Sequence, residues 1–486
     1  MSLLGIDLGT SGVRVAAYDL AGGEIAAASA GTTLHRPAPG LAELDAEEVM
    51  AAVIRLCAEV TASAPVRADP VESLSFAVLG EAVLPVDGAG KALAPAPVSM
   101  DRRGETTAAC LADVLGNRVV QEITGQPLHP MFAVHKISAS AQWPVAAQYQ
   151  SLGEYVAGQL GARPAVDLTM AARTGAFDVQ RRQWSTDILD ALGVGATTLA
   201  EVVPAGTVVG TVSSEAAAST GVAAGTPIIA GLHDQAASFL GGGGRAGSSC
   251  VVSFGSSDCL TVGTTSRPAG LDGTGFASYP VREDLWVTLA GTAAGGWALT
   301  WFADLVRATG QEWEALYDVS AQAPPGLLVM PYFAGSGTLD NDPDARAAVL
   351  GLTLETSRSD LARAFLEASG FEIAKIADAL ARSGVPPTQA YAVGGGARSV
   401  SALQVRADAA GIPLTGVAAN ASTRGAAMVA GLGIGAFGTV TDVPLPPVGF
   451  RAEPRHEHTS WYAAQRATFA ATYQTLRPVN QALAAL

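Results

Sequence analysis

A short turn of small residues near the N-terminus, Gly9 to Gly12, constrains the fold of this chain more than any other feature. Apolar runs lie on both sides of it, and a third run, Glu24 to Ala27, follows a second glycine turn at Gly22 and Gly23. Short apolar runs joined by tight glycine turns are typical of a β-meander. The chain is therefore expected to begin with three antiparallel strands.

One acid, Asp7, lies inside the first apolar run. Burying a carboxylate costs free energy unless a cation, a proton or several hydrogen-bond donors compensate it. The small residues that follow let backbone N–H groups approach an anion closely, and Arg14 adds a positive charge. An acid, a donor-rich turn and a base together suit Mg²⁺ and a polyphosphate. An ordinary hairpin whose aspartate caps the turn explains the same residues.

The length and charge of the chain narrow the classes of protein further. Its 486 residues exceed one ordinary hydrophobic core and predict two or three domains. Because 49% of the residues are hydrophobic and 15% are charged, the chain is globular and not disordered. The net charge of 29 − 44 = −15, without a long basic run, argues against a nucleic-acid or anionic-membrane partner. Any phosphate chemistry must therefore depend on local donors.

The sequence shows neither the pattern of a targeting segment nor the cysteine spacing of a disulfide framework. Met1 and Ser2 lead straight into the first strand, without the pattern of a signal peptide. The longest apolar run, Ala426 to Gly438, is too short to span a bilayer and predicts a buried helix and turn. The four cysteines show neither zinc-site nor disulfide spacing. We therefore expect a cytoplasmic protein.

Helix-like and strand-like patterns alternate after the meander. Residues Ala46 to Thr61 have the spacing of an amphipathic helix, and Asp45 is its expected N-cap. Three strand-like runs are visible in the same half: Val71 to Val78, Ala82 to Val86, and Pro227 to Ala230. This order is that of an α/β fold.

The clearest internal break is the glycine run Gly241 to Gly244. Beyond it, the stretch CVVSFGSSDCLTVG repeats the order strand, glycine turn, strand, as a duplicated fold would. We predict two domains, residues 1–243 and 244–486. The second should contain a strand at Leu327 to Phe333 and a strand and turn at Tyr391 to Gly396. Its two long helices are expected at Arg358 to Ala381 and Trp461 to Ala485.

An aspartate stands at the junction between a strand and a helix in the first half. Gly231 to Gln235 follows the apolar run and precedes a helical run, so that Asp234 lies at the helix N-terminus. A carboxylate there is expected to stay ionised at neutral pH, and it can deprotonate an alcohol that attacks a γ-phosphate. A plain helix N-cap is the alternative. We assign no catalytic role to His233.

Two more glycine turns follow in the second half. Ser253 to Asp258 offers hydroxyl and backbone donors that suit a γ-phosphate, although an ordinary hairpin turn explains it equally well. Gly394 to Ser399 follows a strand and precedes a helix, where glycines let the backbone lie against a nucleotide. The segment Gly291 to Trp297 is also rich in glycine and leads into a helix.

Taken in order, these stretches resemble the motifs of the FGGY carbohydrate kinases, within the wider superfamily of sugar kinases, actin and chaperone ATPases. Gly9 to Gly12 is similar to the family's first phosphate motif, and Gly231 to Gln235 to its G-x-x-D-x-A element. Ser253 to Asp258 resembles the second phosphate turn, and Gly394 to Ser399 the adenosine motif. The resemblance covers nearly the whole chain, and the ordered set is more specific than any single motif.

The resemblance implies a fold and an activity. The expected fold is two actin-like (ribonuclease H-like) α/β domains with the active site in the cleft between them. Residues 1–243 would hold the sugar and the first phosphate motif, and residues 244–486 most of the ATP. The implied activity is transfer of a phosphoryl group from ATP, with Mg²⁺, to a terminal hydroxyl of a polyol or of a sugar, namely a ketose such as a pentulose.

The resemblance also assigns roles to single residues. Asp234 is the implied general base, and Asp7 organises the Mg²⁺ ion. The residues expected to bind ATP are small residues and one base: Gly9, Thr10, Ser11, Arg14, Gly255, Ser256, Gly295, Gly296, Gly394 and Gly395. The residues expected to bind the substrate are charged: Glu81, Asp101, Arg103, Asp234 and Asp258. Because an acid too close to a triphosphate would repel it, we expect Asp258 to face the sugar.

The sequence departs from the family pattern at a few places. Gly335 to Leu339 stands where G-E-R-T-P is frequent, Ala345 to Ala347 replaces A-R-G, and Asn420 stands where a glutamate is common. These changes bear on substrate and domain contacts and leave Asp7 and Asp234 in place. Two rivals remain open: a catalytically silent sugar- or nucleotide-binding regulator, and an actin- or chaperone-like ATPase.

The charged candidates also predict the class of substrate. Three acids (Glu81, Asp101 and Asp258) accompany one base, Arg103, and such a pocket would repel a carboxylate. We therefore expect a ketose or polyol and not an aldonate, unless Arg103 pairs with one of the acids. The expected partner is a small molecule, with neither nucleic acid nor membrane, and a homodimer is left open.

Overall fold

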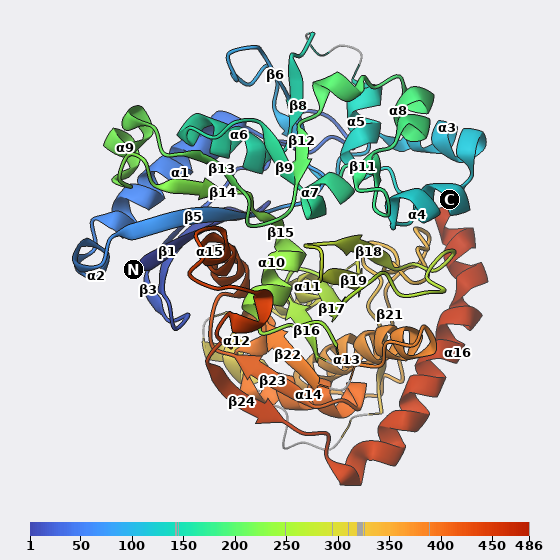
Figure 1. Ribbon diagram of the computed structural model, residues 1–486. Coiled ribbons are helices and arrows are strands. Elements are labelled where there is room, and N and C mark those ends of the chain that lie inside the picture. The colour runs from blue at the N-terminus through green and yellow to red at the C-terminus, as the bar shows by residue number, and fades with distance from the viewer. Residues whose placement is uncertain are drawn as a thin grey trace.

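The computed structural model describes residues 1–140, 143, 145–247, 249–293, 295–309, 311–317, 324, 326–387 and 389–485. Figure 1 shows two α/β halves, one above the other, with the last helix along one side of the lower half. We call residues 1–243 the N-terminal half and residues 244–486 the C-terminal half. Among the described residues, no helix is long and apolar enough to cross a membrane.

The sheet of the N-terminal half begins with the predicted meander. Strands β1 (Ser2–Leu8), β2 (Gly12–Asp19) and β3 (Glu24–Gly31) pair antiparallel in chain order, which confirms that prediction. β5 (Val71–Val78) lies parallel to β1 on its other side, and the sheet continues through β14 (Pro227–Ile229) to β13 (Val208–Thr211).

The first long helix follows its predicted bounds. Helix α1 spans Ala46–Thr61, and the Asp45 carboxylate accepts hydrogen bonds from the N–H groups of Glu47 and Glu48. The predicted strand from Ala82 forms only over Leu84–Val86 (β6), because Glu81 takes the left-handed backbone conformation, with φ at 64°, and breaks the extended run.

The C-terminal half repeats the arrangement. β16 (Ser249–Phe254) pairs antiparallel with β17 (Asp258–Thr264), and β17 pairs with β19 (Trp286–Gly291), which forms a second meander. β22 (Gln389–Val393) lies parallel to β16, as β5 does to β1. The sheet order is β18-β19-β17-β16-β22-β23-β24, with the outer strands Ala277–Pro280 (β18), Leu414–Val417 (β23) and Val448–Ala452 (β24). The expected two-domain α/β fold is confirmed.

Two helices lie between the sheets in Figure 1: α10 (Asp234–Gly241) and α15 (Ala421–Gly433). They pack closely because glycines remove the side chain at the contacts. A Cβ atom on Gly425 would lie 1.9 Å from the Ala237 carbonyl oxygen, and one on Gly5 would lie 1.9 Å from that of Thr423. Helix α15 thus joins the core of the N-terminal sheet, although it comes from the other half of the chain. The boundary at 243/244 stays a prediction.

The C-terminal half contains three other long helices. They are α13 (Arg358–Arg382), α14 (Val400–Ala410) and α16 (Thr459–Ala484), and the first and last agree with the predicted helices. Shorter elements of this half are α11 (Gly296–Leu305), α12 (Gln311–Leu316), β20 (Leu328–Met330) and β21 (Ala348–Leu350). The four cysteines are free thiols, as expected.

The part of the N-terminal half between β6 and β13 carries short elements. Its helices are α3 (Glu105–Leu115), α4 (Asn117–Thr124), α5 (Ala133–Ala139), α6 (Leu152–Leu160), α7 (Leu168–Ala172) and α8 (Thr186–Leu192). After β14, the two-residue strand β15 (Leu232–His233) pairs parallel with the end of β5 and leads directly into α10.

Candidate active site

A cavity of about 430 Å³ opens where the two halves meet. Both halves line it. Its walls include polar groups of the N-terminal half (Thr10, Glu81, His129, Arg173, His233, Asp234 and Gln235) and of the C-terminal half (Ser257, Thr292, Ser336, Thr338 and Asn341). We call this space the substrate cavity.

Asp234 lies in the wall of the substrate cavity at the first turn of α10. The residue at the N-cap position is His233, which makes no side-chain cap, so the cap alternative does not describe Asp234. The Asp234 side chain is 31% exposed, so a substrate hydroxyl in the cavity can reach it. His233 lies beside it, with Nε2 at 3.1 Å from Oδ1 and Nδ1 at 2.8 Å from the Tyr279 hydroxyl.

The pKa of Asp234 is raised from 3.8 to about 7. Burial is the main cause, since Oδ1 is buried although the side chain as a whole is partly exposed. The neighbouring carboxylates of Asp7 and Glu81 add to it, while Arg173 opposes them. This corrects the expectation that Asp234 is fully ionised at neutral pH. A carboxylate whose pKa lies near neutrality is a suitable general base, because it is partly ionised and still basic enough to take a proton.

Asp7 lies near the end of β1, opposite Arg14 on β2. Its carboxylate accepts a hydrogen bond from the Ser422 hydroxyl at the start of α15. Burial raises the pKa of Asp7 to about 6, against the effects of Ser422 and Arg14. The effect of burial on this carboxylate thus outweighs the hydrogen bond and the positive charge that these two residues supply. A bound cation would supply what is missing.

The described residues contain no cluster of three or more histidine, cysteine or acidic side chains that could hold a metal ion alone. Such a cluster is not required for Mg²⁺, which in phosphoryl-transfer sites binds one or two carboxylates together with substrate phosphates and water. Asp7 lies close enough to Asp234 for its charge to raise the pKa of that carboxyl group, and Asp7 remains the predicted metal ligand.

The two predicted phosphate turns meet at the substrate cavity. Thr10 of the first turn and Ser257 of the second both line it. The first turn is closed by a bond from the Gly9 N–H to the Gly12 carbonyl, and the carbonyl of Ser11 accepts from Thr32. Residues with hydroxyl groups from both halves therefore line one space, where such groups can donate hydrogen bonds to an anion.

The second phosphate turn, Gly255 to Ser257, is fixed on the N-terminus of α11. The N–H groups of Gly295 and Trp297 donate to the Ser256 carbonyl, and that of Gly296 donates to the Gly255 carbonyl. Ala294 lies outside the described residues. The amides of Gly295 and Gly296 thus hold the turn, while the exposed Ser256 side chain remains a predicted phosphate ligand.

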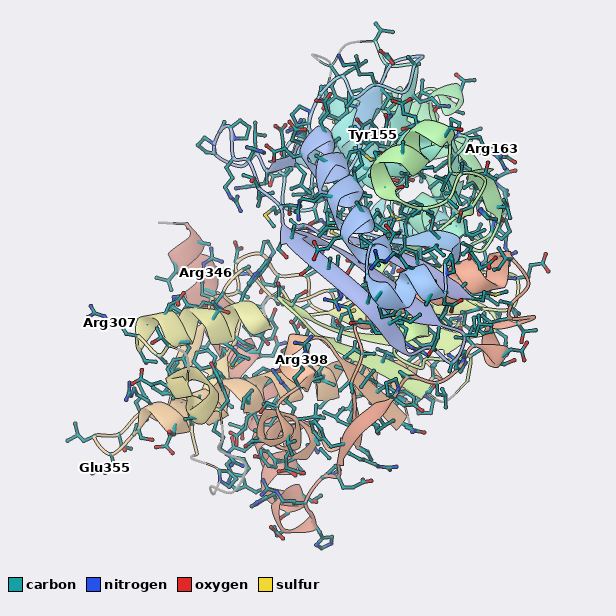
Figure 2. All side chains as sticks on the ribbon, turned by 90° about the vertical axis from the view of Figure 1, so that its left-hand side faces the viewer. Tyr155, Arg163, Arg307, Arg346, Glu355 and Arg398 are labelled. Atoms are coloured by element: carbon teal, nitrogen blue, oxygen red, sulfur yellow. The ribbon has the colours of Figure 1, made fainter. Side chains whose placement is uncertain are left out.

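A second cavity, of about 470 Å³, holds the predicted adenosine motif. We call it the nucleotide cavity. Residues from both halves line it, among them Arg14, Glu24, Ser238, Ser253, Gly394, Gly395, Arg398, Asn420 and Ser422. Arg14 donates to both carboxylate oxygens of Glu24, at 3.1 and 3.0 Å. Arg398, labelled in Figure 2, is exposed. Because Ser422 also binds Asp7, this cavity adjoins the predicted metal ligand.

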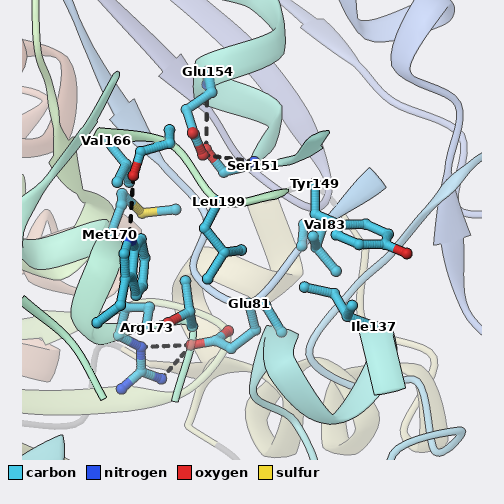
Figure 3. Close-up of a pocket in the computed structure, with 15 residues that line it drawn as sticks. Glu81, Val83, Ile137, Tyr149, Ser151, Glu154, Val166, Met170, Arg173 and Leu199 are labelled. Carbon is cyan, nitrogen blue, oxygen red and sulfur yellow. Dashed lines mark hydrogen bonds and ion pairs between the residues drawn. The ribbon is translucent and has the colours of Figure 1, made fainter. Parts of the chain in front are cut away.

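Glu81 and Arg173 form a buried ion pair on the wall of the substrate cavity. The Arg173 Nε atom lies 2.6 Å from Glu81 Oε1, and Figure 3 shows the guanidinium directed at this carboxylate. Arg173 also donates to the Gln126 side chain and lies 5.0 Å from the centre of the Phe132 ring. Glu81 is therefore present at the cavity, as predicted, with its charge balanced by a base.

Asp101 and Arg103 lie outside the lining of the substrate cavity. Arg103 donates to Asp101 and to Glu43, and the Asp101 side chain is fully buried. Although burial opposes ionisation, hydrogen bonds from Arg103 and from the Ala42 N–H lower the pKa of Asp101. Asp101 lines a neighbouring cavity that shares His129 and Asn341 with the substrate cavity. A contact between Asp101 or Arg103 and the substrate stays a prediction. The ion pair between these two residues argues against it, because each side chain already has a partner.

Asp258 corrects the sequence prediction. It is 1% exposed, lies inside the C-terminal half, and accepts a hydrogen bond of 2.6 Å from the Ser369 hydroxyl. It does not line the substrate cavity. Hairpin alternation explains the difference, because Asp258 pairs with Phe254 at the base of the second phosphate turn, and its side chain points into the core.

Sequence reasoning missed Arg173, the one cation among the described residues that line the substrate cavity. One signal was present. Arg173 directly follows the apolar helix Leu168–Ala172, and an arginine in such a position needs an acidic partner. Nothing in the sequence identified Glu81 as that partner.

Family models match most of the chain. The model described as "FGGY family of carbohydrate kinases, N-terminal domain" matches residues 2–241, and the corresponding C-terminal model matches residues 250–434.

Several carbohydrate kinases are similar to the chain over more than four fifths of their length. A glycerol kinase from Thermus brockianus is 30% identical over 471 residues, which cover 91% of this chain and 92% of that protein. A gluconokinase from Bacillus subtilis is 27% identical, covering 84% and 82%. The crystal structure of a xylulose kinase from Rhodospirillum rubrum superposes with a TM-score of 0.89 at 26% identity, covering 99% and 100%.

Proposed function

The chain belongs to the FGGY family of carbohydrate kinases, and on that premise we propose that it transfers the γ-phosphoryl group of ATP to a terminal hydroxyl of a neutral ketose or polyol. The family makes it a phosphotransferase with an alcohol group as acceptor. The alternative of a silent regulator is not favoured, since the similar proteins are kinases and Asp234 is in place. One observation carries the proposal: Asp234 faces a cavity that both predicted phosphate turns also reach.

In the proposed mechanism, Asp234 accepts the proton of the substrate hydroxyl as its oxygen attacks the γ-phosphorus atom. Thr10 and Ser257, from opposite halves, would bind the transferring phosphoryl group through their hydroxyls. The β- and α-phosphates would extend towards Arg14, Gly394 and Gly395 in the nucleotide cavity. Closing of the cleft around the substrate would exclude water, which otherwise competes as acceptor.

We assign the Mg²⁺ ion of the reaction to Asp7, whose negative charge also raises the pKa of Asp234. When bound, the ion would neutralise phosphate charge. The Ser422 hydroxyl orients the Asp7 carboxylate from the start of α15. A cytoplasmic location, a possible homodimer and the absence of nucleic-acid and membrane partners remain predictions.

The charge of the substrate cavity favours a neutral substrate. Among the described residues that line the cavity, Glu81 and Asp234 are acidic. Arg173 binds Glu81 and Gln126, so it offers little free positive charge to the carboxylate of a substrate. Hydroxyl and imidazole groups such as Ser336, Thr338 and His129 suit a polyhydroxylated ligand. Asp101, Arg103 and Asp258 do not line this cavity and therefore do not set its charge, contrary to the prediction from the sequence.

A substrate screen tests this proposal. With ATP and Mg²⁺, we expect at least one neutral pentulose, hexulose or polyol to be phosphorylated with a kcat/KM roughly tenfold or more above that of gluconate. That ratio corresponds to about 1.4 kcal/mol of charge repulsion. A higher kcat/KM for gluconate than for every neutral compound would contradict the assignment of substrate class, and no turnover of any compound would contradict the function.

The pH dependence of the rate tests the role of Asp234. Below its pKa of about 7 the carboxyl group holds a proton and cannot act as base, so kcat/KM should rise with pH and level off above about 7. Both substrates should be kept below their KM, so that the free enzyme titrates. Glu81→Gln removes a negative charge near Asp234 and should move the rise to lower pH. A flat profile between pH 5.5 and 8 would contradict the assignment.

A further inference from the structure

Asp258 is a buried acid to which the proposed mechanism gives no role. It begins β17, directly after the second phosphate turn, and its backbone is fixed by Thr292, whose N–H donates to the Asp258 carbonyl at 2.8 Å. A Cβ atom on Gly295 would lie 2.3 Å from Oδ1, so the carboxylate lies directly beneath the N-terminus of α11. A carboxylate in such a place costs free energy and needs compensation.

The compensation comes from two helices behind the sheet. The Ser369 hydroxyl of α13 donates to Asp258 Oδ2 at 2.6 Å and accepts from Arg406 Nε of α14 at 3.1 Å. Arg406 is 1% exposed and donates through Nη1 to the Gly396 carbonyl at 2.7 Å. We call these three residues, Asp258, Ser369 and Arg406, the buried bridge.

The two ends of the buried bridge are the two nucleotide elements of the C-terminal half. At one end Asp258 anchors the second phosphate turn, Gly255 to Ser257. At the other end, Arg406 donates a hydrogen bond to the carbonyl of Gly396, the last residue of the glycine loop Gly394 to Gly396. The guanidinium carbon also lies 4.3 Å from the centre of the Phe254 ring, on the strand that leads into the turn.

The turn and the loop already touch through their backbones. Gly394 has a φ of 86°, and a Cβ atom there would lie 2.6 Å from the Phe254 carbonyl oxygen. The parallel pairing of β16 with β22 sets the two strands that lead into the turn and the loop side by side. The buried bridge adds directional, charge-assisted hydrogen bonds beyond the ends of these strands, where the loop and the turn leave the sheet.

We propose that Asp258, Ser369 and Arg406 are positioning residues for the nucleotide, holding the glycine loop and the second phosphate turn in the arrangement that binds ATP and ADP. The inference rests on the proposed function of these two elements. The Asp258 carboxylate would act through Ser369 and Arg406 and would not itself contact the nucleotide. Loss of one member should weaken nucleotide binding and leave the sugar side unaffected.

The test compares Asp258→Asn with a matched control, Glu367→Gln. Glu367 is also a buried acid, 1% exposed, that accepts from a hydroxyl (Tyr462, 2.8 Å) and from an arginine (Arg363, 2.8 Å) on the same helix α13. Its contacts lead to α16 and away from the nucleotide cavity. The two variants should change the melting temperature alike, because each replaces a carboxylate whose pKa is raised by burial and that accepts a hydrogen bond from a hydroxyl.

The decisive measurement is the dissociation constant of ADP by calorimetry, in the full chain with Mg²⁺. We expect Asp258→Asn to raise it roughly tenfold and Glu367→Gln to change it less than twofold. At the same time, the KM for the best sugar or polyol should change less than twofold in both. Equal ADP affinity in Asp258→Asn and the unaltered chain, or equal weakening in both variants, would overturn the proposal.

Ser369→Ala provides a milder variant in case Asp258→Asn does not fold. It removes one hydroxyl and should weaken ADP binding about threefold or more. The double variant with Asp258→Asn should bind ADP as tightly as the single variant that binds it less well, because both changes break the same bridge. ADP affinity within twofold of the unaltered chain would overturn the proposal. If the unaltered chain binds ADP but phosphorylates no tested compound, the proposed function fails while the positioning inference stands on the ADP data.

Discussion

Asp234→Asn is expected to lower kcat by roughly 10²-fold to 10⁴-fold, the usual contribution of a positioned general base. Asparagine has the same shape as aspartate but cannot accept the proton of the substrate hydroxyl. The measurement is the rate of ADP formation at saturating ATP and substrate, with ADP affinity determined separately. Because Asp234 lines the substrate cavity and not the nucleotide cavity, ADP should bind with nearly unchanged affinity.

The stability of the same variant provides the control. A carboxyl group whose native pKa is raised holds its proton between pH 3.8 and about 7, where the unfolded chain has lost it, so native stability falls as the pH rises through that window. Asp234→Asn removes this cost, and its melting temperature at pH 8 should be equal to or above that of the unaltered chain. Near-normal turnover in a folded variant would contradict the role of Asp234 as base.

Asp7→Asn is expected to raise the Mg²⁺ concentration for half-maximal rate by about tenfold or more, the usual effect of losing a group that holds or orients a metal. The amide keeps a hydrogen bond with Ser422 but loses the negative charge that attracts the cation. The measurement is a Mg²⁺ titration of the rate at fixed ATP, together with Mg²⁺-dependent ADP binding.

Two comparisons separate a metal role from a structural one at Asp7. Ser422→Ala removes the hydrogen bond and keeps the charge, so it should shift the Mg²⁺ dependence less than Asp7→Asn. Since the pKa of Asp7 is raised to about 6, the loss of its charge should not lower the melting temperature at pH 8. An unchanged Mg²⁺ dependence with a large loss of stability would show that Asp7 only closes the hairpin.

Local signals predicted much of the fold. Glycine turns between apolar runs identified both meanders, and Asp45 marked the first residue before α1. The position of Asp234 at the junction of β15 and α10 was also predictable, because a strand that ends in a polar residue before a helical run is a local pattern. These features depend on residues that are neighbours in sequence.

Local patterns thus predict the order of the elements, the repeated strand plan and the position of Asp7 and Asp234 at the ends of strands. The electrostatics of the site depend instead on contacts between distant segments: the pKa of Asp234 depends on burial and on Asp7 and Glu81, and Arg173 balances Glu81. The tertiary structure also decided that Asp258 turns inward to Ser369 and Arg406, and that α15 packs on the opposite sheet. Burial and pairing between distant segments follow from packing, which no local pattern in one sequence encodes.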